Sequence, residues 1–419
     1  MQTKNICNGV DLRTIPNPKF KTNTLSIFFH IPLKRETVTM AALLPAVLKR
    51  GCEKYPEYKT ITRHLADLYS ASCSSGIRLK GEGEVLYFTM SYIADTYIGE
   101  NLTAQVAEFL KELVFCPLVR DGGFLPEYVE SEKVNLRNAI LGLINDKKEY
   151  ADAKCREAMF GKDGYGMFEA GYAEDLDSIT PQKLYAFYQE ILSGAKADIF
   201  VGGTVVEENL NCICEVLSPQ FSPRDASYVQ TVPAVPERGE VQQVTEPMQT
   251  AQSKLAIGLK CGINPKEEAY YALMLGSCIF GGSPFSKLFN NVREKLSLAY
   301  YAACRTDRLK SVMMISSGIE TKNFQKAYDE IMVQLAKMKQ GEISEDELAA
   351  AKKYLSSGLI AMYDTMRVLE DYYLSQAILG QNQSPEELIA KLNQVTIPQI
   401  QAVMQKLAVD TVYFLKGEV

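Results

Sequence analysis

Histidine and cysteine are the residue types best suited to bind a metal or to act as nucleophiles, and this chain offers few histidines. The 419 residues include two, His30 and His64, so a three-histidine zinc site is excluded. His30 lies in an apolar run typical of a buried strand, and His64 lies in a segment with the apolar spacing of a helix. We interpret both as structural residues. A mixed metal site would need both of them and carboxylates brought together by the fold.

The ten cysteines are scattered and form no C-x-x-C motif. Several lie in apolar runs, as Cys116 and Cys278 do, which is typical of small buried side chains in a reducing compartment. A hydrolase that uses a cysteine and a histidine would require an exposed thiol of low pKa near His30 or His64. The first sixteen residues lack the apolar core of a signal peptide, and no run of apolar residues is long enough to cross a membrane. We therefore expect a cytoplasmic protein.

The composition is that of a globular protein and points away from nucleic acids. Apolar residues make up 47% and charged residues 23% of the chain, and the net charge is −6. A mildly acidic chain without basic blocks repels a phosphate backbone. We expect no nucleic-acid partner and no membrane partner.

The elements that must position any site occur twice in the same order. Each copy contains a strand, two helices and two strands, and each ends with a helix followed by a strand. Three helices have clear start signals, namely Thr180-Pro181 and the capping boxes that begin at Ser344 and Ser384. The expected ranges are 23–33, 40–51, 59–72, 73–81, 85–93 and 178–203 in the first copy, and 253–263, 267–282, 285–297, 300–307, 311–319 and 394–418 in the second.

This order predicts an α+β fold with two homologous halves. Each half is expected to be a mostly antiparallel sheet with helices on one face, and the two halves to form a clamshell. We predict an N-terminal half over 1–222, a proline-containing extended linker over 223–247, and a C-terminal half over 248–419.

Two segments resemble the pitrilysin/insulinase peptidases, the inverzincins, a family that includes the subunits of mitochondrial processing peptidase. ALLPAVLKRGCEKYP (42–56) resembles the zinc-binding helix of the family and the turn that follows it. FSKLFNNVREKLSLAYY (285–301) resembles its segment S-R-L-F-x-x-V-R-E-x-x-G-L-A-Y. The resemblance covers nearly the whole chain and implies the same two-half fold.

The zinc motif of the family is missing. Active members carry H-x-x-E-H on the first helix, where two imidazoles one turn apart bind zinc and the glutamate acts as the general base. The matching positions here are Ala42, Pro45 and Ala46, and the further zinc-binding glutamate corresponds to Ala139. None of these side chains can donate a lone pair or accept a proton. We expect the chain alone to bind no metal, to need no cofactor and to hydrolyse no peptide.

The second motif is intact, with Arg293 and Tyr300 seven residues apart. The spacing alone predicts that Arg293 is a solvated helix residue and that Tyr300 is an aromatic residue of the core. The resemblance instead implies that the pair holds the substrate backbone and stabilises the tetrahedral oxygen, which in two-chain members lies beside the zinc of a partner.

Two functions follow from this resemblance. The first is an inactive subunit that supplies Arg293 and Tyr300 to peptide substrate in a heterodimer with a zinc-bearing paralogous chain. The alternative is a non-catalytic peptide-binding or assembly protein, possibly a homodimer, in which an exposed edge strand pairs with an extended peptide.

Overall fold

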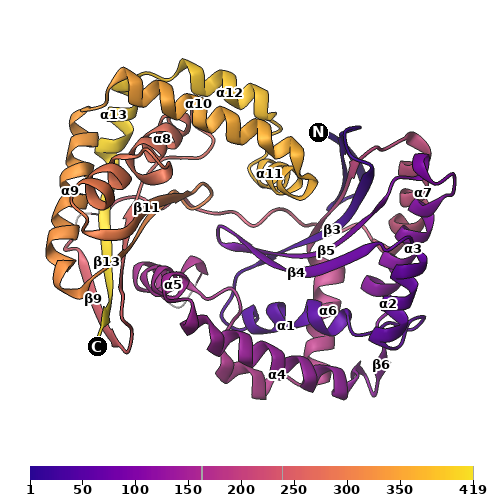
Figure 1. The fold of residues 1–419 in the computed structure, drawn as a ribbon. Coiled ribbons are helices and arrows are strands. Elements are labelled where there is room, and N and C mark those ends of the chain that lie inside the picture. The colour runs from indigo at the N-terminus through magenta and orange to yellow at the C-terminus, as the bar shows by residue number, and fades with distance from the viewer. Residues whose placement is uncertain (162–163, 238, 419) are drawn as a thin grey trace. The chain divides into compact units, whose positions relative to one another are not determined.

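The computed structural model describes residues 1–161, 164–237 and 239–418 and contains two compact units (Figure 1). The first unit consists of Met1–Leu141, Phe168–Gln230 and Tyr363–Asn382. The second consists of Gly142–Met167, Thr231–Met362 and Gln383–Val419. Each unit thus includes one short segment from the opposite half of the sequence. The predicted division into 1–222, 223–247 and 248–419 follows sequence position, whereas each compact unit combines segments from both halves. The predicted boundaries stay a prediction.

The first unit is built on a six-stranded sheet in the order β1-β2-β8-β3-β5-β4. All its pairs are antiparallel except β2 with β8. Long runs of β-branched and aromatic residues, such as LSIFFHI in β3, favour these central strands. The strands are β1 (Gln2–Cys7), β2 (Val10–Pro16), β3 (Thr22–Pro32), β4 (Ser72–Lys80), β5 (Gly83–Ile93) and β8 (Lys196–Gly203), and a separate small hairpin joins β6 (Val119–Arg120) to β7 (Gly123–Phe124).

Alternate side chains of β3 face different layers. Leu25, Ile27 and Phe29 belong to a large apolar core that also takes in the helices α1, α3 and α6. On the opposite face lies α11, whose Asp371 accepts hydrogen bonds from Arg78 and Lys80 of β4. The helices of the unit are α1 (Val38–Leu48), α2 (Tyr58–Asp67), α3 (Leu102–Phe115), α4 (Pro126–Gly142), α6 (Pro181–Gly194), α7 (Glu207–Leu217) and α11 (Met366–Ile378).

The second unit repeats this plan with a five-stranded sheet in the order β11-β12-β10-β13-β9, in which only β13 and β9 run parallel. Its strands are β9 (Gln242–Met248), β10 (Ser253–Lys260), β11 (Ala299–Asp307), β12 (Val312–Ile319) and β13 (Ala408–Gly417). Its helices are α5 (Lys147–Phe160), α8 (Ala269–Ser277), α9 (Phe324–Gln340), α10 (Glu345–Ala361), α12 (Pro385–Gln394) and α13 (Ile397–Lys406), with π-helical turns at Cys278–Gly282 and Leu288–Lys295. Short 3₁₀ turns lie at 95–97, 143–145, 164–166, 173–178, 218–220, 321–323 and 362–364 of the chain.

One helix in each unit comes from the other half of the sequence. In the second unit, α5 packs on the sheet so closely that Gly258 leaves no room for a Cβ beneath Met159. In the first unit, Gly202 meets Met366 of α11 in the same way. Both sheets therefore carry several helices on one face and a single exchanged helix on the other.

The α+β class with mostly antiparallel sheets is confirmed, and the helix start signals are confirmed as well. Thr180 Oγ1 accepts a hydrogen bond from the Lys183 amide at 3.1 Å. Ser344 and Ser384 each cap a helix reciprocally with a glutamate three residues on. One detail differs, because the last part of the predicted linker is β9, which pairs with β13.

Candidate functional site

Helix α1 presents no zinc-binding group at the positions of the family motif. Ala42 and Ala46 are half-buried and Pro45 is buried. Residues four apart lie on one helical face, so this face offers two methyl groups where two imidazoles would be needed. Within 1–161, 164–237 and 239–418, no three His, Cys, Asp or Glu side chains gather where they could hold a metal ion. The residues on α1 therefore do not fit the zinc ion that the family resemblance implies.

A carboxylate of α4 is paired with an arginine that follows α1. Glu132 of α4 forms an ion pair with Arg50, which follows α1, and Arg50 also donates to Ser131 Oγ at 2.7 Å. Ala139, the position matching the last zinc ligand, is exposed on α4. These contacts join the segment after α1 to α4.

Arg293 and Tyr300 lie on either side of one turn in the second unit. Arg293 is in the last turn of the π-helical segment Leu288–Lys295, and Tyr300 is the second residue of β11. Ser297 lies between them with φ of +49°, a left-handed conformation that strains a residue with a Cβ. π-Helical turns and such strained residues are frequent at functional sites.

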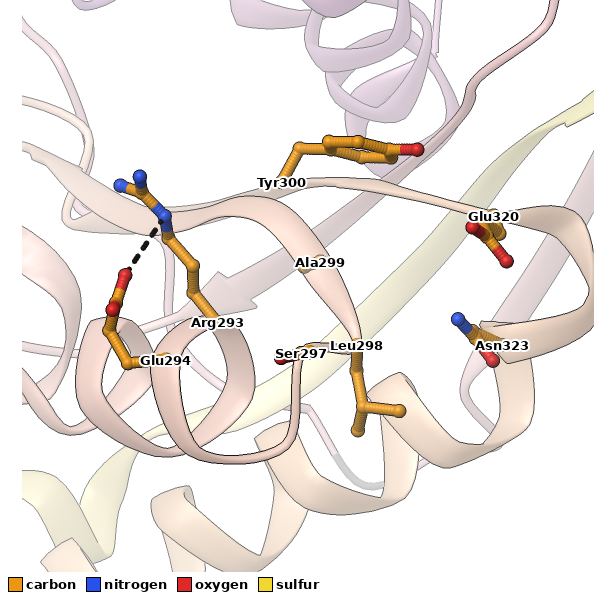
Figure 2. A pocket seen from close by; sticks show the side chains of 8 residues that line it. All are labelled: Arg293, Glu294, Ser297, Leu298, Ala299, Tyr300, Glu320 and Asn323. Carbon is orange, nitrogen blue, oxygen red and sulfur yellow. Dashed lines mark ion pairs between the residues drawn. The ribbon is translucent and has the colours of Figure 1, made fainter.

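The two side chains line a pocket of about 400 Å³ (Figure 2). Figure 2 shows the Arg293 guanidinium and the Tyr300 ring along one rim, with Glu320 and Asn323 across the pocket from Arg293. The full lining is Arg293, Glu294, Ser297, Leu298, Ala299, Tyr300, Glu320 and Asn323.

Both side chains are accessible. The Tyr300 residue is 60% exposed, so it is not a core aromatic. The neighbouring Tyr301 contrasts with it, because burial and nearby carboxylates raise the pKa of Tyr301 far above its ordinary value. The Arg293 side chain is 43% exposed, and its Nε lies 3.3 Å from Glu294 Oε1. Its guanidinium carbon lies 4.7 Å from the ring centroid of Phe289, a cation–π contact that helps to hold the side chain in place.

This arrangement can donate hydrogen bonds. A guanidinium and a phenol are donors suited to a peptide carbonyl or to an oxygen that gains negative charge. The Glu320 carboxylate is engaged by Lys322 at 2.9 Å. Tyr300 also lies on β11, which is an edge of its sheet in the described part of the chain and pairs there with β12. β4 is likewise an edge of the other sheet. Edge strands can pair with an extended peptide.

The two histidines occupy the elements expected of them and have partners that sequence reasoning missed. His30 Nε2 lies 2.8 Å from Oδ2 of Asp198, a residue 168 positions away. Burial would raise the pKa of Asp198, but the His30 hydrogen bond and the charges of Lys196 and Arg13 lower it well below its usual range. His64 stacks on Tyr55 at 4.5 Å between ring centroids.

Among the described cysteines whose pKa is shifted, the shift is upward, away from an activated thiol. Burial is the main cause that raises the pKa of Cys73 and Cys278 to about 11 each, and of Cys304 to about 12. A thiol with a raised pKa is a poor nucleophile at neutral pH.

No described helix combines the length and the apolarity that membrane spanning requires.

Comparisons with known proteins identify the family of this chain. Residues 178–355 match the family model described as the peptidase M16 inactive domain. The probable inactive metalloprotease YmfF of Bacillus subtilis is 33% identical over 413 residues, or 98% of this chain and 96% of that protein. The uncharacterized zinc protease YmxG of the same organism is 24% identical over 254 residues, or 60% of this chain and 61% of that protein.

A solved structure shows the same likeness over the whole chain. The crystal structure of a conserved protein from Enterococcus faecalis V583 superposes with a TM-score of 0.91 at 33% identity, covering 100% of this chain and 98% of that one. Fold and sequence agree with the resemblance drawn from the two motifs. The chain belongs to the M16 peptidase family and is similar to members described as inactive.

Proposed function

We propose that this protein is a catalytically silent M16 subunit that supplies Arg293 and Tyr300 to a peptide held together with a zinc-bearing partner chain. The observation that supports the proposal most is a contrast within the molecule. The zinc helix has lost every ligand, whereas Arg293 and Tyr300 remain exposed on the rim of a pocket of about 400 Å³. Side chains kept only for packing would be buried.

The role proposed for the pair is electrostatic. Arg293 carries a permanent charge on a planar fork of donors, and Tyr300 adds one directional O–H. Both would donate to the substrate backbone and to the oxygen that becomes charged when water attacks the peptide carbonyl. A donor of this kind contributes about 3 kcal/mol to transition-state stabilisation. The metal and the general base would come from the partner chain, which carries H-x-x-E-H.

The test is an assay of peptide cleavage by the two purified chains together. The partner is the zinc-bearing M16 chain of the same organism, and the readout is kcat/KM for a mixed-sequence peptide library. Arg293→Ala and Tyr300→Phe are each expected to lower kcat/KM by about 100-fold, the effect of losing one such donor. Tyr354→Phe is the matched control, because Tyr354 is 43% exposed on α10 and outside the pocket. Unchanged cleavage in both pocket variants, with the control normal, would refute a role in trans.

A second function is favoured by the position of Tyr300 on an edge strand. The alternative is a non-catalytic peptide-binding or assembly protein, possibly a homodimer, in which β11 or β4 pairs with an extended peptide. It predicts that the chain alone binds peptides and that a zinc-bearing chain gains no activity from it. Replacing Ala303 of β11 by proline removes a main-chain donor from this strand. Loss of peptide binding in that variant, with no rate effect of Arg293→Ala, would favour the alternative.

The domain boundaries and the cellular location are part of the proposal. We propose homologous halves over 1–222 and 248–419 with the connection over 223–247, in a cytoplasmic protein. Limited proteolysis that cuts first within 223–241, ahead of β9, would support these boundaries.

A further inference from the structure

The pocket that contains Arg293 and Tyr300 has two walls, which come from different elements of the second unit. Arg293 lies in the π-helical segment Leu288–Lys295, and Asn323 directly precedes α9 on the other wall (Figure 2). The spacing of the two walls therefore depends on how the π-helical segment is held against α9. A residue that fixes this packing would position Arg293 without touching a peptide.

A π-helical segment needs such support from its surroundings. Its hydrogen bonds join each amide to the carbonyl five residues earlier, as the Leu296 amide donates to the Asn291 carbonyl at 3.2 Å. This pattern is rare and occurs mostly as single turns inside α-helices, which indicates that it is less stable than the α-helical pattern. A slip of one residue toward the α-helical pattern would turn Arg293 about the axis of the segment. The position of Arg293 is thus sensitive to the contacts of this segment.

A chain of polar side chains, which we call the amide relay, joins this segment to α9. Asn291 Nδ2 donates to Gln334 Oε1 at 3.2 Å and also to the Lys287 carbonyl oxygen at 2.9 Å. Gln334 Nε2 donates in turn to Glu330 Oε1 at 2.6 Å, one helical turn earlier on α9. The relay thus consists of Asn291, Gln334 and Glu330. Gln334 is 2% exposed, so little water competes for its hydrogen bonds.

The relay adds direction to apolar contacts that lack it. Leu288 and Val292 of the same segment are fully buried, but apolar attraction is not directional. A hydrogen bond is directional, and the loss of one buried partner leaves the other polar group unpaired. The relay therefore favours one rotation of the segment, in which Asn291 faces α9 and Arg293 lines the pocket.

We propose that Gln334 is a positioning residue for Arg293. Through Asn291 it holds the π-helical segment in the rotation that places the Arg293 guanidinium on the rim of the pocket. Phe289, one turn before Arg293, then packs against the guanidinium at 4.7 Å. The effect on the conformation of Arg293 concerns this chain alone, whereas the effect on peptide cleavage rests on the proposed function.

The first test measures the rate at which phenylglyoxal modifies Arg293 in the full-length chain, with mass spectrometry as the readout. Gln334→Met removes both hydrogen bonds of the amide and keeps the side-chain length, so Arg293 should react about five-fold faster, the effect of losing one neutral hydrogen bond. Arg305, whose side chain is 60% exposed, is the internal reference and should keep its native rate. Gln325→Met is the matched control, because Gln325 forms the same kind of hydrogen bond to Asp329 at an exposed position of α9. An unchanged rate at Arg293, or an equal rise in Gln325→Met, would overturn the proposal.

The second test measures peptide cleavage by the same chain together with the zinc-bearing partner. Gln334→Met should lower kcat by about ten-fold and change KM by less than about two-fold, because a donor that acts in the transition state is misplaced. In the Arg293→Ala background the same replacement should have no further effect, since a positioning residue acts only through the residue that it holds. An equal fall in both backgrounds would show a general structural defect and overturn the positioning role. No effect of Arg293→Ala itself would instead refute the proposed function, and the modification rate would still decide the positioning.

A second variant keeps the test decisive if Gln334→Met fails to fold. Asn291→Ala cuts the amide relay at a half-buried position and leaves the hydrogen bond between Gln334 and Glu330 in place. This variant should also raise the modification rate of Arg293 about five-fold. A native rate in Asn291→Ala would show that the relay does not hold Arg293 and would overturn the proposal.

Discussion

Glu84 is the buried group whose removal should change stability most clearly. It lies on β5, where its cross-strand neighbours are Ile31 and Leu79, and it is 0% exposed. Neither of its carboxylate oxygens has a hydrogen-bond partner among the described residues. Burial, with a smaller effect from Glu169, raises the pKa of Glu84 from 4.5 to about 9. The folded protein therefore holds a proton on Glu84 that the unfolded chain has released at neutral pH.

The sign and size of the effect follow from linkage. Because the pKa of Glu84 is raised in the folded state, Glu84 lowers the free energy of unfolding least below pH 4.5. The free energy of unfolding then falls as the pH rises toward about 9. Each pH unit across this window costs about 1.4 kcal/mol. At pH 7, two and a half units above the unfolded value, the penalty is about 3 kcal/mol. Glu84→Gln has the same shape and cannot ionise, so it should be more stable than the native chain by about 3 kcal/mol at pH 7.

The measurement is urea unfolding of both proteins at pH 4 and pH 7, followed by fluorescence of tyrosine and by circular dichroism. The gain should be present at pH 7 and nearly absent at pH 4. Glu36→Gln is the matched control, since Glu36 is exposed and its replacement should change stability by less than about 0.5 kcal/mol at either pH. A Glu84→Gln gain that does not depend on pH, or a loss at pH 7, would show that the carboxyl group is not held neutral in the folded protein.

Three further predictions concern other parts of the molecule. Ser297→Gly should raise stability by about 1 kcal/mol in urea unfolding, because glycine adopts the φ of +49° without strain; a destabilised variant would contradict the strain. Asp198→Asn should lower stability by about 3 to 5 kcal/mol at pH 7, because Arg13 and Lys196 lose a buried partner. The pKa of Asp198 is lowered in the folded state. The stability difference from the native chain should therefore shrink as the pH is lowered into the acid range. Metal analysis of the purified chain should find no stoichiometric zinc on α1. The double replacement Ala42→His and Ala46→His should increase zinc affinity, because the two imidazoles would lie one helical turn apart. Stoichiometric zinc bound to α1 of the native chain would contradict this prediction.

Short-range features of this protein could be predicted from the sequence because their causes lie within a few residues. The cap at Thr180 and the capping boxes at Ser344 and Ser384 depend on side chains three residues apart, and all three are present. The missing chemistry of α1 is also local, since alanine and proline bear no ligand in any fold. The segment around Arg293 and Tyr300 identified the family, although their roles remain a proposal.

Exposure at the candidate pocket could not be predicted in this way. Spacing alone suggested that Tyr300 is a core aromatic, whereas the residue is 60% exposed on an edge strand. The adjacent Tyr301 has the same side chain and is largely covered. Alternation along a strand states that neighbours face opposite sides, but not which side is covered or whether the strand is an edge.

By itself, the sequence determined the element order, its duplication, the helix caps and the lack of the motif H-x-x-E-H on α1, because each depends on residue type and on spacings of a few residues. Only the tertiary structure decided that α5 and α11 cover the sheets of the opposite halves, that β9 joins β13, and that Asp198 reaches His30 from 168 positions away. These contacts form between residues far apart in the sequence. Hydrophobic periodicity predicts which face of an element is buried, but not the element that packs against it.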